Sequence, residues 1–135
     1  MSLFRERRAS SYAEAAIALP VVVLVTIALM NLSVAGFASV NASNAANYGA
    51  RTGSVTQQGA GGAAYAAAMA SISNAPVGEY GVSVAGGGFP GARITVKVTW
   101  SVPNYMGPLL SFFGGDGIGG DIQGLATATF RQEGW

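Results

Sequence analysis

The chain has 135 residues, of which half are hydrophobic and only a tenth are charged, well below the charged fraction of ordinary soluble domains. Its net charge of +1 gives no electrostatic footprint for a nucleic acid, so we expect no nucleic-acid partner. Cysteine and histidine are both absent, which removes disulfides, thiolate metal sites and the commonest general base. We therefore expect neither an enzyme nor a cofactor.

The N-terminal third of the sequence predicts a helix that can cross a membrane. Residues 1–9 are short, polar and basic, and no charged side chain occurs between Ala15 and Phe37. A helix over this stretch would be about 35 Å long, against about 30 Å for the hydrocarbon core of a bilayer. A secretory signal peptide would have a shorter apolar core. The basic residues ahead of the helix predict a cytoplasmic N-terminus and an exported remainder: Arg5, Arg7 and Arg8.

This uncharged stretch continues to Arg51, so the sequence predicts one helix over about 7–50. We assign residues 10–52 to the transmembrane and filament-core segment. Its outer half is rich in Ala, Ser and Asn, whose small side chains let helices approach closely. Such a helix is longer than a bilayer and too poor in charge to face water, so it is predicted to need helical partners. Pro20 predicts a kink or a melted turn, and an ordinary anchor helix with an incidental proline is the alternative.

The remainder, residues 53–135, predicts a small αβ head. The glycine-rich TGSVTQQGAGG reads as a break, and a short helix follows over 63–73. Alternation of apolar and polar residues predicts strands at 80–84, 94–102 and 122–132, the first two forming an antiparallel hairpin. The expected class is α+β: a long N-terminal hydrophobic helix, a short helix and a three-stranded antiparallel sheet, with the helices covering its apolar face.

The segment before the last strand, residues 103–121, has no clear period. It combines six glycines with four large apolar residues: Leu109, Leu110, Phe112 and Phe113. We predict that these four form a subunit contact, and burial inside the head is the alternative. The pattern GGDGIGGD holds two aspartates, too few for a calcium site, so no bound metal is expected.

Glu14 is the most informative single residue. It stands at the threshold of the apolar run, where an ionised carboxylate is expensive to bury. It needs either a partner of opposite charge or a place at the membrane interface. Its chemistry alone leaves both open.

The residues around Glu14 resemble a known family. Arg7-Arg8, a small residue, Glu14 and the run AAIALPVVVLV are similar to the TadE-like pilins of tight-adherence pili, a branch of the type IV pilin class. The resemblance implies a structural subunit of an extracellular bacterial pilus, for adhesion or surface attachment. The alternative is a minor pilin or single-pass membrane protein that primes assembly of another pilin.

The same resemblance implies partners and a location. The chain would span the inner membrane once, meet a prepilin peptidase and the pilus assembly machinery there, and then join copies of itself in a helical filament on the cell surface. The peptidase would remove a leader, residues 1–9, by cutting between Ala9 and Ser10. After cleavage Glu14 would neutralise the new amino terminus of a neighbour. If the leader remains, Arg7 or Arg8 of a neighbour is the natural counter-charge.

Two further features of the sequence lead to expectations about ligands and modification. If the head is an adhesive module, its candidate contacts are Phe89, Tyr105 and the stretch from Leu109 to Phe113. The triplets that begin at Asn31 and Asn41 match a glycosylation pattern. Because both lie in the long helix, we interpret them as chance matches.

Overall fold

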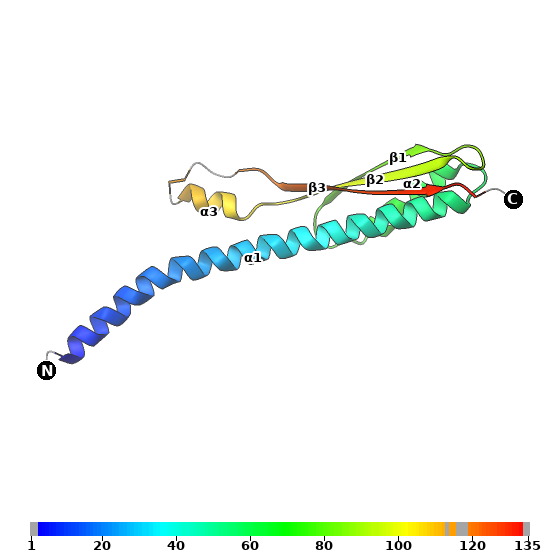
Figure 1. Ribbon diagram of the computed structural model, residues 1–135. Coiled ribbons are helices and arrows are strands. Elements are labelled where there is room, and N and C mark those ends of the chain that lie inside the picture. The colour runs from blue at the N-terminus through cyan, green and yellow to red at the C-terminus, as the bar shows by residue number, and fades with distance from the viewer. Residues whose placement is uncertain (1–2, 113, 116–118, 134–135) are drawn as a thin grey trace. The chain divides into compact units, whose positions relative to one another are not determined.

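The computed structural model describes residues 3–112, 114–115 and 119–133, with the side chains of 3–10 and 112 left outside the description. Its elements are, in chain order, α1 (Leu3–Val55), α2 (Ala60–Ile72), β1 (Glu79–Gly86), β2 (Arg93–Val102), α3 (Met106–Phe112) and β3 (Ile122–Arg131) (Figure 1). The predicted α+β class is confirmed. The chain divides into two units, residues 1–32 with 105–119 and residues 33–104 with 120–135, and each is described by itself.

Helix α1 is longer than the sequence predicts. It continues to Val55, so the predicted break directly after Arg51 is wrong. The reason is packing at Gly53, where an added Cβ would lie 2.8 Å from the Ala64 Cβ and 2.9 Å from the Ala60 carbonyl oxygen. Gly53 therefore allows a close approach between helices. The chain turns later, at Gly59, whose φ of 70° is the left-handed conformation that glycine adopts readily.

The first unit holds the apolar half of α1 together with α3. The short helix α3 was not predicted, because its seven residues span only about two turns and show no helical periodicity of apolar residues. It begins just after a hydrogen bond in which the Tyr105 amide donates to the Asn31 side-chain oxygen, at 3.1 Å. Asn31 is only 8% exposed. A buried amide is costly unless it is hydrogen-bonded, so Asn31 fixes the chain at the start of α3.

In the second unit, α2 packs on the C-terminal half of α1 through residues with little or no side chain. An added Cβ at Gly49 would lie 2.7 Å from the Ala64 carbonyl oxygen and 2.9 Å from the Ala68 Cβ. The two helices therefore approach more closely than larger residues would permit. The alanines that α1 buries in this unit are Ala38, Ala42, Ala45, Ala46 and Ala50.

The sheet has the order β1-β2-β3 and is antiparallel throughout. The three predicted strands are confirmed, with β2 in the centre. On the inner face Ile94, Val96 and Val98 are fully buried in one core with α2 and the alanines of α1, so the predicted helical cover is also confirmed. Phe130 is the cross-strand partner of the buried Ile94, but it remains 38% exposed near the end of β3.

A side-chain latch joins the end of β3 to the end of α1. The Gln132 side chain is 2% exposed. Its Nε2 donates to the Thr56 carbonyl at 2.9 Å, and its Oε1 accepts from the Gly88 amide at 3.1 Å. Beside it, the Glu133 amide donates to the Ser54 carbonyl at 2.8 Å. These bonds satisfy backbone groups that the helix end and the glycine loop leave without partners.

Candidate functional site

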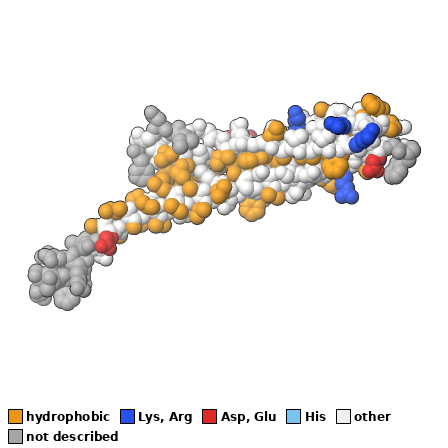
Figure 2. All heavy atoms as spheres, viewed as in Figure 1, with side chains coloured by type: hydrophobic (Ala, Val, Ile, Leu, Met, Phe, Trp, Pro, Cys, Tyr) orange, Lys and Arg blue, Asp and Glu red, His pale blue; other side chains and the backbone are white. Residues whose placement is uncertain are grey.

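The candidate site is the surface of α1 that its own chain leaves uncovered. In the first unit the exposed residues of α1 include many large aliphatic side chains: Ile17, Leu19, Val21, Val22, Val23, Val25, Leu29, Met30 and Leu32. Figure 2 shows these hydrophobic side chains gathered on this half of the helix. Exposed aliphatic residues at this density are unfavourable in water and require another environment.

The second unit also leaves part of the α1 surface uncovered. Ser33, Gly36, Phe37 and Val40 line a shallow apolar depression of about 340 Å³. Phe37 is 66% and Val40 57% exposed, while nothing lies within 4 Å of the place where a Cβ of Gly36 would be. A glycine notch beside a large apolar side chain is a typical helix-packing feature. Further along, the exposed aromatic and aliphatic residues of α1 are Tyr48 and Val55.

The length of this apolar segment exceeds what a bilayer can cover. Among the described residues, α1 from Ser11 to Val55 is long and apolar enough to span a membrane. Its 45 residues correspond to about 67 Å of helix, roughly twice the hydrocarbon thickness. The segment is compatible with a single membrane span. About half of its length would then extend beyond the lipid.

The comparison with family models is decisive for this segment. Residues 10–51 match the model described as TadE-like protein. These residues are TadE-like. The resemblance predicted from the sequence is confirmed over this segment. No curated protein and no solved structure matches the chain.

Glu14 lies within the TadE-like segment, on an exposed turn of α1 just before the charge-free run. The predicted cleavage position, Ala9 and Ser10, is part of the helical backbone of α1, since the helix begins at Leu3. The side chains of Arg7 and Arg8 lie outside the described residues. The pairing of Glu14 with a charge on a neighbour therefore stays a prediction.

Pro20 is also inside the TadE-like segment, and α1 remains helical through it. No turn is melted there. The proline ring still removes the amide that would bond to the carbonyl four residues earlier, at Ala16. That carbonyl is free to accept a bond from outside the helix or to tilt the helix locally, so the predicted kink stays a prediction.

The four apolar residues predicted as a subunit contact lie outside the TadE-like segment. Leu109 and Leu110 are half-buried in α3. The side chain of Phe112 and the whole of Phe113 lie outside the described residues. Tyr105 and Phe89, the candidate ligand contacts, are both exposed. A subunit contact through α3 stays a prediction.

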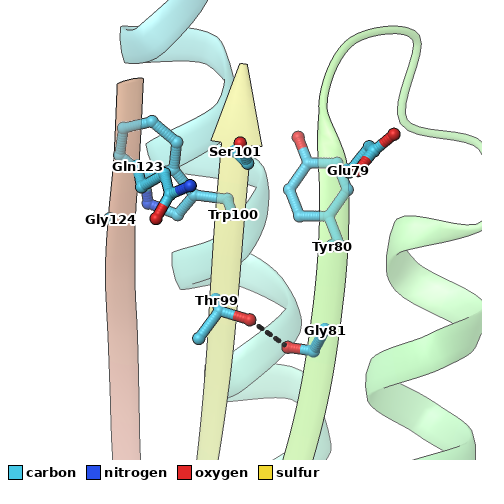
Figure 3. Close-up of a pocket in the computed structure, with 8 residues that line it drawn as sticks. All are labelled: Glu79, Tyr80, Gly81, Thr99, Trp100, Ser101, Gln123 and Gly124. Carbon is cyan, nitrogen blue, oxygen red and sulfur yellow. Dashed lines mark hydrogen bonds between the residues drawn. The ribbon is translucent and has the colours of Figure 1, made fainter. Parts of the chain in front are cut away.

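A second surface region, which the sequence analysis did not single out, lies at one end of the sheet. Glu79, Ser101 and Gln123 belong to neighbouring strands and line a depression of about 350 Å³ (Figure 3). Beneath it the Trp100 ring lies over Gly124, where an added Cβ would collide with the indole. A signal was present in the sequence, because Gly124 interrupts an otherwise regular strand, and such a glycine often marks a close approach.

Proposed function

We propose that this chain is a structural subunit of a tight-adherence pilus, assembled by packing α1 against copies of itself. The observation that carries the proposal is the uncovered face of α1, which is apolar or small-sided and extends further than lipid can cover. The TadE-like match over residues 10–51 supports the same assignment.

The physical basis is an exchange of environments. Before assembly, lipid surrounds the exposed aliphatic residues of the first unit. After assembly, neighbouring helices surround them, and each buried methylene contributes about 0.8 kcal/mol relative to water. In this assembly we expect Phe37 to pack at Gly36 of a neighbouring copy, because Gly36 leaves open space in the same apolar depression. Such a filament needs no covalent links.

Glu14 has a defined role in this assembly. In the packed core its carboxylate would be removed from water, and an unpaired buried charge costs several kcal/mol. The amino terminus of Ser10 on a neighbour neutralises it if the leader is cut. Arg7 or Arg8 of a neighbour does so if the leader remains. The inner membrane, a prepilin peptidase and the assembly machinery are the partners that precede the filament.

The proposal assigns no catalytic activity to the chain. Support comes from the composition, which contains no histidine and no cysteine. It places the mature subunit outside the cell.

The test introduces one charge into the uncovered face. Val40→Glu puts a carboxylate at an exposed position, where it leaves the single chain folded but becomes unpaired when helices pack on it. We expect the amount of this protein in fibres sheared from the native cells to fall by about tenfold or more, with normal protein in the membrane. Immunoblots of the sheared and membrane fractions measure both.

The matched control is Gln58→Glu, which adds the same charge at an exposed position between α1 and α2. We expect normal fibres from it. Normal fibres from Val40→Glu would refute packing through this face. If the wild-type protein is scarce in purified fibres of another pilin, the minor-pilin role is correct and the major-subunit proposal is wrong.

A further inference from the structure

The outer face of the sheet is opposite the face that the helices cover, and its charges are segregated. Along each strand the more exposed residues alternate with the more buried ones, and the residues of the outer face are the exposed set together with their cross-strand partners. Basic residues lie at the end of the sheet where β1 ends and β2 begins. Acidic residues lie at the other end. Figure 2 shows basic side chains gathered near the end of the second unit where β1 ends and β2 begins.

The basic end is formed by Arg93 and Arg131, which are direct cross-strand partners. Lys97 follows on the same face of β2. Between them the Thr95 and Thr129 hydroxyls share a hydrogen bond of 2.9 Å. Like charges directly opposite on a sheet destabilise the folded chain, so this arrangement is unfavourable for an isolated subunit.

The acidic end is formed by Glu79 and by Asp121, which precedes β3. The Ser101 hydroxyl donates to the Asp121 carboxylate at 3.5 Å. Glu79 and Ser101 line two neighbouring depressions, of about 350 and 340 Å³, and the second also includes Asp121. Long basic side chains could enter these depressions and reach both carboxylates.

The two ends cannot meet within one chain. Glu79 pairs with Ser101 and Arg131 pairs with Arg93, so the ends are eight residues apart along β2. At about 3.3 Å per residue this is about 26 Å. Glu133, the remaining acidic residue near the basic end, leaves the sheet at the point where its amide bonds to Ser54 on α1.

We propose that the outer face of the sheet is a contact between successive copies of the chain, in which the basic end of one copy binds the acidic end of the next. The proposal rests on the proposed function and adds a second, polar contact to the packing of α1. A contact between two different patches is heterologous, and such contacts generate open helical filaments where the rotation between copies does not close into a ring. The occupant is a second copy because one face carries both complementary charges.

Charge reversal with rescue tests the proposal. Arg93→Glu with Arg131→Glu reverses the basic end, and Glu79→Arg with Asp121→Arg reverses the acidic end. Each pair brings like charges together between copies, so we expect the fibre yield to fall about tenfold or more. The chain with all four changes restores opposite charges and should recover most of the wild-type yield.

Two controls keep folding and helix packing separate from this contact. Arg93→Gln with Arg131→Gln removes the charges without adding repulsion, and we expect an intermediate yield. Thermal unfolding in detergent should show that each variant is folded, with the chain that carries Arg93→Gln and Arg131→Gln at least as stable as the wild type because the cross-strand repulsion is removed. Glu133→Arg changes one charge at an exposed position off the outer face and should leave the yield unchanged.

The outcomes separate this inference from the proposed function. Absence of the wild-type protein from fibres refutes the proposed function itself. Wild-type fibres with normal yields from both reversed pairs refute the sheet contact and leave helix packing intact. A loss in both pairs without rescue in the combined chain also refutes it. Normal fibres that lose binding to anionic lipid vesicles when the basic end is reversed would assign that end to an anionic surface instead.

Discussion

Between Ala15 and Val55 helix α1 carries one charged residue, Arg51, yet its exposed and buried side chains differ between the two units in size. In the first unit the residues are large and exposed, as at Ile17, Leu19 and Val25. In the second unit the residues facing α2 and the sheet are alanine and glycine, and they are buried. Large side chains provide area for lipid or for other copies. Small side chains permit close approach within the chain. Side-chain size along α1 thus distinguishes the exposed surface, whose surroundings change on assembly, from the buried contacts within the chain, which stay the same.

The largest loss of stability is expected when a glycine in the contact between α1 and α2 is replaced by a larger residue. Gly49→Leu forces its side chain against the Ala64 carbonyl and the Ala68 methyl group. We expect the second unit to lose about 3 kcal/mol of stability, because overpacking a close contact strains backbone as well as side chains. Hydrogen exchange of the β2 amides in detergent measures this loss.

The matched control for this change is Gly36→Leu, on the uncovered face, where nothing lies within 4 Å of the new Cβ. Exchange in β2 should be unchanged, while assembly should suffer. Equal protection of β2 in the Gly49 variant and the wild type would show that α2 does not pack on α1 as described.

The next largest loss of stability is expected from removing the hydrogen bonds of Gln132, the latch between the end of β3 and the end of α1. Gln132→Leu keeps an apolar side chain of similar size but leaves the Thr56 carbonyl and the Gly88 amide without the amide partner. We expect a loss of about 2 kcal/mol in the second unit. Chemical denaturation followed by circular dichroism measures it. Gln123→Leu, at an exposed position of β3, is the control and should change little.

A smaller effect is expected in the first unit. Asn31→Leu removes the acceptor of the Tyr105 amide bond and replaces a buried polar group by an apolar one. We expect a local loss of about 1 kcal/mol, seen as faster hydrogen exchange at Tyr105 and α3 with no change in β2. Exchange that speeds up equally in β2 would show that the two units do not respond independently.

The smallest effect is a gain. Gly62 lies on an exposed turn of α2, with nothing within 4 Å of an added Cβ. Gly62→Ala should stabilise the second unit by about 0.5–1 kcal/mol, because alanine loses less backbone entropy in a helix. A higher midpoint in thermal unfolding checks this. Gly53→Ala, which places its Cβ against Ala64, should lower the midpoint.

The same contrast explains what could be predicted from sequence. The strands and the long helix follow from alternation and from the absence of charge, which are local signals. The end of α1 could not be predicted in this way, because glycine is typical of turns and the contact of Gly53 with α2 depends on residues that follow later in the sequence. The pairing of Asn31 with Tyr105 joins residues 74 apart in sequence, and no local pattern reports it.

The candidate site was predicted only in part. The apolar run around Pro20 marked the uncovered face, and the TadE-like match covers it. The charge segregation on the outer face of the sheet was missed, since it depends on the register that sets Arg93 opposite Arg131. Register is fixed by the whole sheet and not by either strand alone.

The most direct test of helix packing uses the absence of cysteine from the chain. Phe37→Cys places a single thiol on the uncovered face, and Phe89→Cys places one in the exposed loop between β1 and β2. In purified, lipid-free fibres a water-soluble maleimide should label the Phe89 variant and leave the Phe37 variant unlabelled, because neighbouring helices cover that position. Equal labelling of both variants in intact fibres would contradict packing through the uncovered face.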